Sequence, residues 1–189
     1  MNKWKLCLAA IALSLTASPI LAKRYSPPPA VFLDAVTVGR YDIDYYIPAS
    51  FHQVDQHVYL HGQTINFVPL KQDQDNWNQQ ITLSLTHRPD LTAYQKIRNI
   101  QSHYSRTYGK VDIDGGKYDR YKGADSDYQQ ADTTITYTKD GQTWVSHFSF
   151  YSDQEVLVGS QVTHLVGRSK SQAQKDAKRL SKTITSLKE

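Results

Sequence analysis

Two clusters of cationic residues are the part of this sequence best suited to recognising a partner. In the first, Lys117-Tyr118-Asp119-Arg120-Tyr121-Lys122, tyrosines alternate with charged residues. The second lies near the C-terminus. Cations interleaved with aromatic rings can hold phosphate groups or stack on flat ligands. The candidate binding residues are therefore Lys117, Arg120, Tyr121, Lys122, Lys175, Lys178, Arg179 and Lys182.

No pattern for nucleophilic catalysis is complete. Gly159-Ser160-Gln161 lacks the second glycine of Gly-x-Ser-x-Gly, and Ser160 falls in the middle of an expected strand. His147 and His164 lie on neighbouring expected strands and could approach each other. A small hydrolase with a Ser/His site therefore remains the alternative to a non-enzymatic protein.

The spacing of possible metal ligands does not predict a metal site. His57 and His61 are four residues apart, but they span an expected strand and turn rather than a helix. Asp112 and Asp114 precede two glycines, yet no glutamate lies between residues 71 and 154 to close a calcium loop. No glycine-rich phosphate loop is present either. We expect no metal and no cofactor.

The first 22 residues predict export from the cytoplasm. Lys3 and Lys5 precede a short apolar run that ends near Ala22, which is typical of a secretory signal peptide. The run is too short to cross a bilayer, which takes roughly 20 apolar residues. Residues 23–30, with three consecutive prolines, form an extended leader. The remaining residues, 31–189, make one domain.

Removal of the signal peptide changes the bulk properties of the chain. It leaves 167 of 189 residues, enough for one packed core. It also removes Cys7, the only cysteine, so the mature chain has no disulfide and no thiolate site. Loss of Lys3 and Lys5 lowers the formal charge from +4 to +2. Only a local cluster can then attract an anionic partner, and we expect no nucleic-acid binding and a monomer.

Period-two alternation of apolar residues predicts roughly seven strands. A three-strand meander begins near Ala131, with Asp140-Gly141 as its first hairpin turn. Its last strand, from Val156 to Val166, is long and regular, which is typical of the middle of an antiparallel sheet. The strands expected before the meander are Val36–Ile47, His57–Leu60, Thr64–Leu70, one around Leu83, and Val111–Ile113, which stops at a turn in Asp114-Gly115-Gly116.

Two segments predict helices. The first begins after Thr92, whose spacing to Gln95 is that of a capping box, and runs to about Arg106. The second, Ser171–Leu187, has an apolar stripe that is expected to pack on the Trp144/Phe148/Phe150 face of the sheet. The fold class is thus α+β, a central antiparallel sheet of about six or seven strands covered by two helices.

This order of elements resembles the Mog1/PsbP-like α/β/α sandwich. Two parts of the sequence support the resemblance: Asn76-Trp77-Asn78-Gln79-Gln80-Ile81-Thr82, where a tryptophan leads into a strand, and the meander Thr133–Val166. That family's members bind a small GTPase or support photosystem II, and neither function follows from the fold. In style the chain also resembles small exported proteins of Legionella-like bacteria, some released by type II secretion.

Together these features predict an exported, non-enzymatic binding module, either secreted or periplasmic. Its basic, tyrosine-rich surface would bind a protein partner or an anionic membrane surface containing phosphoinositide or phosphatidylserine. The mature chain has no expected transmembrane segment. Besides the hydrolase, a periplasmic accessory protein is the remaining alternative.

Overall fold

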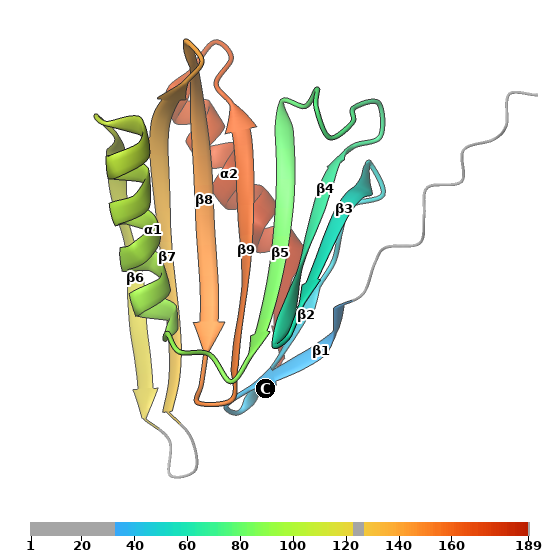
Figure 1. Ribbon diagram of the computed structural model, residues 1–189, viewed down its shortest axis with the longest axis vertical. Helices are drawn as coiled ribbons and strands as arrows, with labels where there is room; N and C mark the ends of the chain where they lie inside the picture. Colours follow the sequence, from blue (N-terminus) through green and yellow to red (C-terminus); the bar gives the residue numbers. More distant parts are fainter. Residues whose placement is uncertain (1–32, 123–126, 189) are drawn as a thin grey trace, which may run out of the picture.

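A seven-stranded antiparallel sheet forms the centre of the structure, a computed structural model that describes residues 33–122 and 127–188 (Figure 1). The expected signal peptide and leader lie outside the described residues. In spatial order the strands are β3 (Phe51–Tyr59), β4 (Gly62–Pro69), β5 (Gln79–His87), β9 (Val156–Leu165), β8 (Gln142–Ser152), β7 (Asp127–Lys139) and β6 (Asp112–Lys122).

The predicted meander is confirmed as β7, β8 and β9, and β9 is the central strand of the seven. The first turn has positive φ at both Asp140 (52°) and Gly141 (75°), the conformation that two-residue hairpins favour. This turn fixes the register of the hairpin and places Tyr137 directly opposite Trp144. Both side chains therefore project from the same face of the sheet.

Helix α1 (Ala93–Tyr108) covers part of that face. Its predicted capping box is present: the Thr92 hydroxyl accepts a hydrogen bond from the Gln95 amide (3.3 Å), and the Gln95 side chain accepts one from the Thr92 amide (2.9 Å). The helix packs on β7 and β8, where Ala93 and Ile97 are buried against apolar residues of the sheet. Those sheet residues are Ala131, Ile135, Tyr137, Phe148, Phe150 and Leu157.

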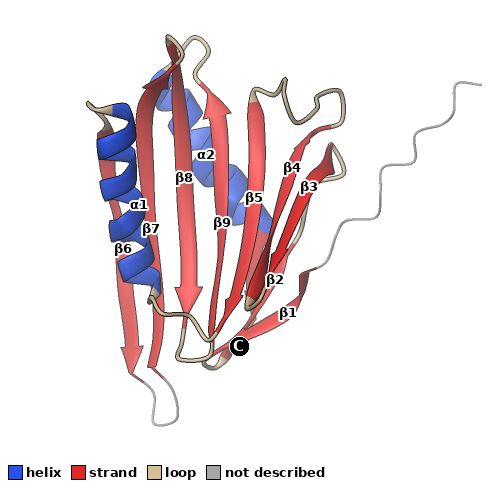
Figure 2. Cartoon of the chain, viewed as in Figure 1, coloured by secondary structure: helices blue, strands red, loops and turns tan. Residues whose placement is uncertain are grey.

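Helix α2 (Lys170–Ile184) lies on the opposite face, behind β8 and β9 in Figure 1. The expectation that α2 covers Trp144, Phe148 and Phe150 is therefore wrong, because α1 covers them. Ala173, Ala177 and Ile184 of α2 instead pack with a separate set of sheet residues. These include Ile81, Leu83, Val145, Val158 and Val162. Figure 2 shows the two helices on opposite sides of the sheet.

A second, three-stranded sheet shares this face with α2, and the sequence did not predict it. It consists of β1 (Leu33–Val38), β2 (Tyr41–Tyr45) and β10 (Thr185–Lys188), with β2 in the middle. The single strand expected over Val36–Ile47 is instead a hairpin that turns at Gly39, where φ is 60°. The helix expected to run to Leu187 ends at Ile184, because the chain then pairs with β2.

The turn expected at Asp114-Gly115-Gly116 is also absent, and β6 runs through these residues with a bulge between Gly115 and Tyr118. A Cβ atom at Gly116 would lie 1.5 Å from the Asp132 carbonyl oxygen, so the close approach of β7 requires a glycine here. Adjacent glycines are compatible with a bulge as well as with a turn, which explains the wrong prediction.

The two faces of the large sheet are covered unequally. Helix α2 and the small sheet lie over one face, whereas α1 packs mainly on β7 and β8 of the other. Beyond α1, the residues of β5 and β4 on this second face are polar and half-buried: Gln80, Thr82, Ser84, Thr86, Thr64 and Asn66. This polar area needs no apolar cover and forms an open surface beside α1.

Packing against Gly159 gives a first prediction. An added Cβ at Gly159 would lie 2.1 Å from the Phe150 ring, so Gly159→Ala should lower the free energy of unfolding by about 1–3 kcal/mol. The matched control is Gly115→Ala, also in a strand, where a Cβ meets nothing within 4 Å. Urea denaturation measures both variants, and equal stabilities would contradict the packing of Phe150 on Gly159.

Candidate functional site

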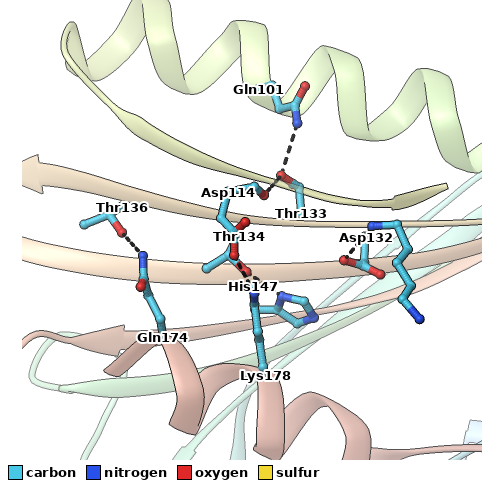
Figure 3. A network of polar contacts seen from close by, with 10 residues as sticks. Gln101, Asp114, Asp132, Thr133, Thr134, Thr136, His147, Gln174 and Lys178 are labelled. Atoms are coloured by element: carbon cyan, nitrogen blue, oxygen red, sulfur yellow. Dashed lines mark hydrogen bonds and ion pairs between the residues drawn. The ribbon is translucent and has the colours of Figure 1, made fainter. Parts of the chain in front are cut away.

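One flank of α2 is bound to the sheet by polar contacts at every fourth residue. Lys170 pairs with Asp112 of β6, the Gln174 amide donates to the Thr136 hydroxyl (3.1 Å), and the Lys178 ammonium pairs with the Asp114 carboxylate (2.5 Å). Residues four apart lie along one side of a helix. Figure 3 shows Gln174 and Lys178 reaching from α2 toward the strands. These contacts hold α2 in a defined position beside β6.

The structure brings one residue of the first cationic cluster to the same flank. The backbone amide of Lys117 in β6 donates to the Asp132 carboxylate (3.3 Å), and the charges of Lys178 and Lys117 both act on this carboxyl group. Burial is the larger effect and raises the pKa of Asp132 above its ordinary value. Lys117 and Lys178, one residue from each cluster, therefore lie near Asp132, although they are distant in sequence.

His147 lies beneath this flank of α2 and is buried. Its Nδ1 atom is 2.9 Å from the Thr134 hydroxyl, as Figure 3 shows. The pKa of His147 is lowered from 6.5 to about 4, mainly by burial and in addition by the positive charges of Lys178 and Lys182, whereas Asp114 acts to raise it. The imidazole is consequently neutral at physiological pH.

The outward side of α2 carries the rest of the second cluster. Lys175, Arg179 and Lys182 are exposed, and the Arg179 side chain, 82% exposed, donates to Asp176 (3.2 Å). Within residues 33–122 and 127–188, no carboxylate pairs with the ammonium groups of Lys117, Lys175 or Lys182. These three ammonium groups are therefore available to an anionic partner.

The first cluster does not form one continuous patch, since successive residues of a strand point to opposite faces. Lys117 lies on the α2 face, whereas Tyr118 and Arg120 lie on the α1 face, where the Tyr118 ring contacts Tyr94 at 4.6 Å. The side chains of Tyr121 and Lys122 lie outside what the structure describes. The expected tyrosine-rich basic surface is thus divided between two faces.

A hollow beside α2 adjoins Arg179. It has a volume of about 410 Å³ and is lined by polar residues that include Ser50, Gln79, His164 and Asp176. The His164 ring is held by the Gln79 amide (2.9 Å), and burial lowers its pKa. A guanidinium at the rim of a polar hollow can bind a phosphate or carboxylate group, although Asp176 competes for the Arg179 guanidinium.

A second hollow of about 410 Å³ lies on the opposite face, where α1 ends. Trp77 from the loop before β5 packs on Trp144 with ring centroids 5.0 Å apart, and Tyr108 packs on Tyr137 at 4.6 Å. Sequence analysis did not identify this aromatic hollow. The Asp140-Gly141 turn was predicted, and its register places Tyr137 opposite Trp144, but nothing in the pattern located Trp77 or Tyr108 beside them.

The contacts of the predicted nucleophile and bases do not form a catalytic pair. Ser160 is buried on the α2 side of β9, and its hydroxyl has no hydrogen-bond partner in the described chain. His147 contacts Thr134, and His164 contacts Gln79. The described residues contain no group of three or more His, Cys, Asp or Glu side chains that could hold a metal ion. None of their helices is long and apolar enough to cross a membrane.

Comparison with known proteins supports the fold. No protein-family model and no curated protein sequence matches the chain. The crystal structure of LpqN, a Mycobacterium tuberculosis protein involved in cell envelope biogenesis, is similar over 84% of this chain and 90% of LpqN, with a TM-score of 0.51 and 14% identity. The solution structure of cyanobacterial PsbP from Synechocystis sp. PCC 6803 matches over 77% of this chain and 86% of that protein, with a TM-score of 0.45 and 10% identity.

The likeness to LpqN supports the predicted α+β sandwich. At 14% identity this similarity concerns the fold alone.

The environment of His147 predicts how stability depends on pH. The pKa is 6.5 in the unfolded chain and about 4 in the folded one, so the unfolded state binds more protons between these values. The contribution of His147 to the free energy of unfolding is complete above pH 6.5. It is lost as the pH falls toward 4, by up to about 3 kcal/mol. The pKa of Asp132 is raised in the folded state, so this carboxyl group instead favours the folded state as the pH falls.

Denaturation of wild type and His147→Gln at several pH values tests this expectation. The glutamine can still bond to Thr134 but does not titrate, so the variant should lose less stability than wild type between pH 7 and pH 4. His103→Gln, at an exposed position of α1, is the matched control. An identical slope in wild type and His147→Gln would contradict the buried, neutral imidazole.

Proposed function

We propose that the protein is an exported, non-enzymatic binding module whose cationic surface on α2 binds an anionic phospholipid headgroup. The surface comprises Lys175, Arg179 and Lys182, with Lys117 from β6 at its edge. Phosphatidylserine and phosphoinositides are the headgroups that such a surface suits. Export rests on the signal-peptide pattern of residues 1–22.

One observation supports this proposal above the others: Lys117 of the first cationic cluster lies beside Asp132, on the same flank as Lys178 of the second cluster. Asp112 and Asp114 neutralise Lys170 and Lys178, whereas Lys117, Lys175 and Lys182 have no such partner in the described chain. The charges of Lys117, Lys175 and Lys182 therefore remain exposed on this side of the molecule. The apolar side of α2 is buried against the sheet, so contact with a membrane would be peripheral and electrostatic.

An acidic protein surface is the second candidate partner. The exposed cations of α2 would attract it in the same way, and the hollow beside Arg179 could receive a carboxylate from it. A hydrolase is less well supported, since Ser160 is buried and neither His147 nor His164 contacts it.

Charge reversal on α2 tests lipid binding. Each basic residue near an anionic membrane contributes about 1 kcal/mol, so Lys175→Glu/Arg179→Glu/Lys182→Glu should weaken binding roughly 100-fold or more. The assay is cosedimentation with vesicles containing phosphatidylserine or a phosphoinositide, at low and high salt. Binding should also decline as salt screens the charges. Lys178 is left unchanged because it anchors α2 to Asp114.

The matched control reverses three exposed cations elsewhere: Lys71→Glu/Arg98→Glu/Arg106→Glu. It changes the net charge by the same amount and leaves α2 intact, so its vesicle binding should stay close to that of wild type. If both triple variants lost vesicle binding equally, binding would depend on net charge alone, which would contradict a specific surface on α2. Absence of wild-type binding to either lipid would contradict the proposal.

A further inference from the structure

The aromatic hollow on the α1 face has the features of a ligand site that is separate from α2. Its aromatic walls come from four segments of the chain: the loop before β5, the last turn of α1, and the ends of β7 and β8. Trp77, Trp144 and Tyr108 are half-buried, so part of each ring remains accessible, whereas Tyr137 is buried beneath them. Its volume of about 410 Å³ lies within the range of small-molecule sites.

Most of the polar side chains around these rings carry an amide or a carboxylate group. Four carry amides and two carry carboxylates: Asn76, Gln80, Gln142, Gln161, Asp75 and Asp140. Amides both donate and accept hydrogen bonds, and carboxylates accept them, so together they suit a ligand with many hydroxyl groups. In the described chain, the side chains of Gln80 and Gln142 have no hydrogen-bond partner and remain available to a ligand.

The floor of the hollow is held in place by its own hydrogen bonds. The Gln161 amide donates to the Thr163 hydroxyl (3.0 Å) and to the Tyr104 hydroxyl (3.4 Å), and Thr163 bonds to Ser146 (2.8 Å). This network orients Gln161 and directs its nitrogen away from a ligand. A site whose polar groups are fixed before binding loses less conformational entropy when the ligand arrives.

The charge of the hollow indicates which ligands it can hold. Asp75 and Asp140 outnumber Lys139, the one cation among its lining residues, so an anionic ligand is disfavoured. A neutral ring with hydroxyl groups at its edge and C–H groups on its faces fits both the aromatic walls and the amides. We infer that this hollow binds a neutral saccharide, with a pyranose ring packed against Trp77, Trp144 or Tyr108.

The uncovered polar part of the sheet could extend the site. From the hollow, Thr82 continues the floor across β5, and its hydroxyl donates to the Asn66 side chain of β4 (2.7 Å). Asn66 in turn contacts Asp55 of β3 (3.4 Å). Since α1 packs mainly on β7 and β8, this polar row beside the helix is only half-buried. A saccharide longer than one unit has a hydrogen-bonding surface along this row.

Tryptophan fluorescence tests the inference directly. Trp4 belongs to the expected signal peptide, so Trp77 and Trp144 are the only tryptophans of the expected mature chain, and both line the hollow. Maltose, cellobiose, lactose and N,N′-diacetylchitobiose are titrated to tens of millimolar. We expect a saturable change in emission with at least one of them. A proline-rich peptide and a nucleoside are titrated as comparison ligands. No change with any of the four saccharides would overturn the inference, as would a response to the peptide or the nucleoside alone.

Paired tyrosine variants locate the binding. Tyr108→Ala removes one wall of the hollow and should weaken binding at least roughly tenfold. Tyr94→Ala, on the same helix but packed on Tyr118 outside the hollow, should bind like wild type. Asn76→Ala, at an exposed position that cannot disturb the core, should also weaken binding. Binding that is equal in wild type, Tyr108→Ala and Asn76→Ala would place the saccharide elsewhere and overturn the assignment.

Discussion

Strands β8 and β9 carry apolar side chains on both faces, and the rest of the structure depends on covering both. On one face Trp144, Phe148 and Phe150 require α1, and on the other Val145 and Val158 require α2 and the small sheet. Exposed apolar area on either face would cost roughly 25 cal/mol per Å². Because α1 packs mainly on β7 and β8, its last turn leaves a hollow beside Trp144, and the polar strands beyond remain open.

Local patterns in the sequence were sufficient to predict most strands of the large sheet and helix α1. The capping box at Thr92, the Asp140-Gly141 turn and the long alternation of β9 each depend on neighbouring residues, and each prediction is confirmed. The small sheet could not be predicted in the same way, because Thr185 pairs with Tyr45 from the other end of the chain. Likewise, alternation alone cannot decide which helix covers which face of β8.

The candidate sites were only partly predictable for the same reason. The cations of α2 follow from the helical period, but their pairing with Asp112 and Asp114 depends on where β6 lies in the folded protein. The aromatic hollow is assembled from segments that have no local relation in sequence. The structure therefore places the cations of α2 and the aromatic hollow on opposite faces of the large sheet.

Helix α1 and Trp77, rather than α2, cover the aromatic face of the meander. A nuclear Overhauser spectrum of the aromatic protons tests this arrangement most directly, because these contacts are short-range and specific. The structure predicts cross-peaks between the indoles of Trp77 and Trp144, whose ring centroids are 5.0 Å apart. It also predicts cross-peaks between Tyr108 and Tyr137, whose ring centroids are 4.6 Å apart. Cross-peaks from Trp144 to Ala173 or Ala177 of α2, without any to Trp77, would contradict it.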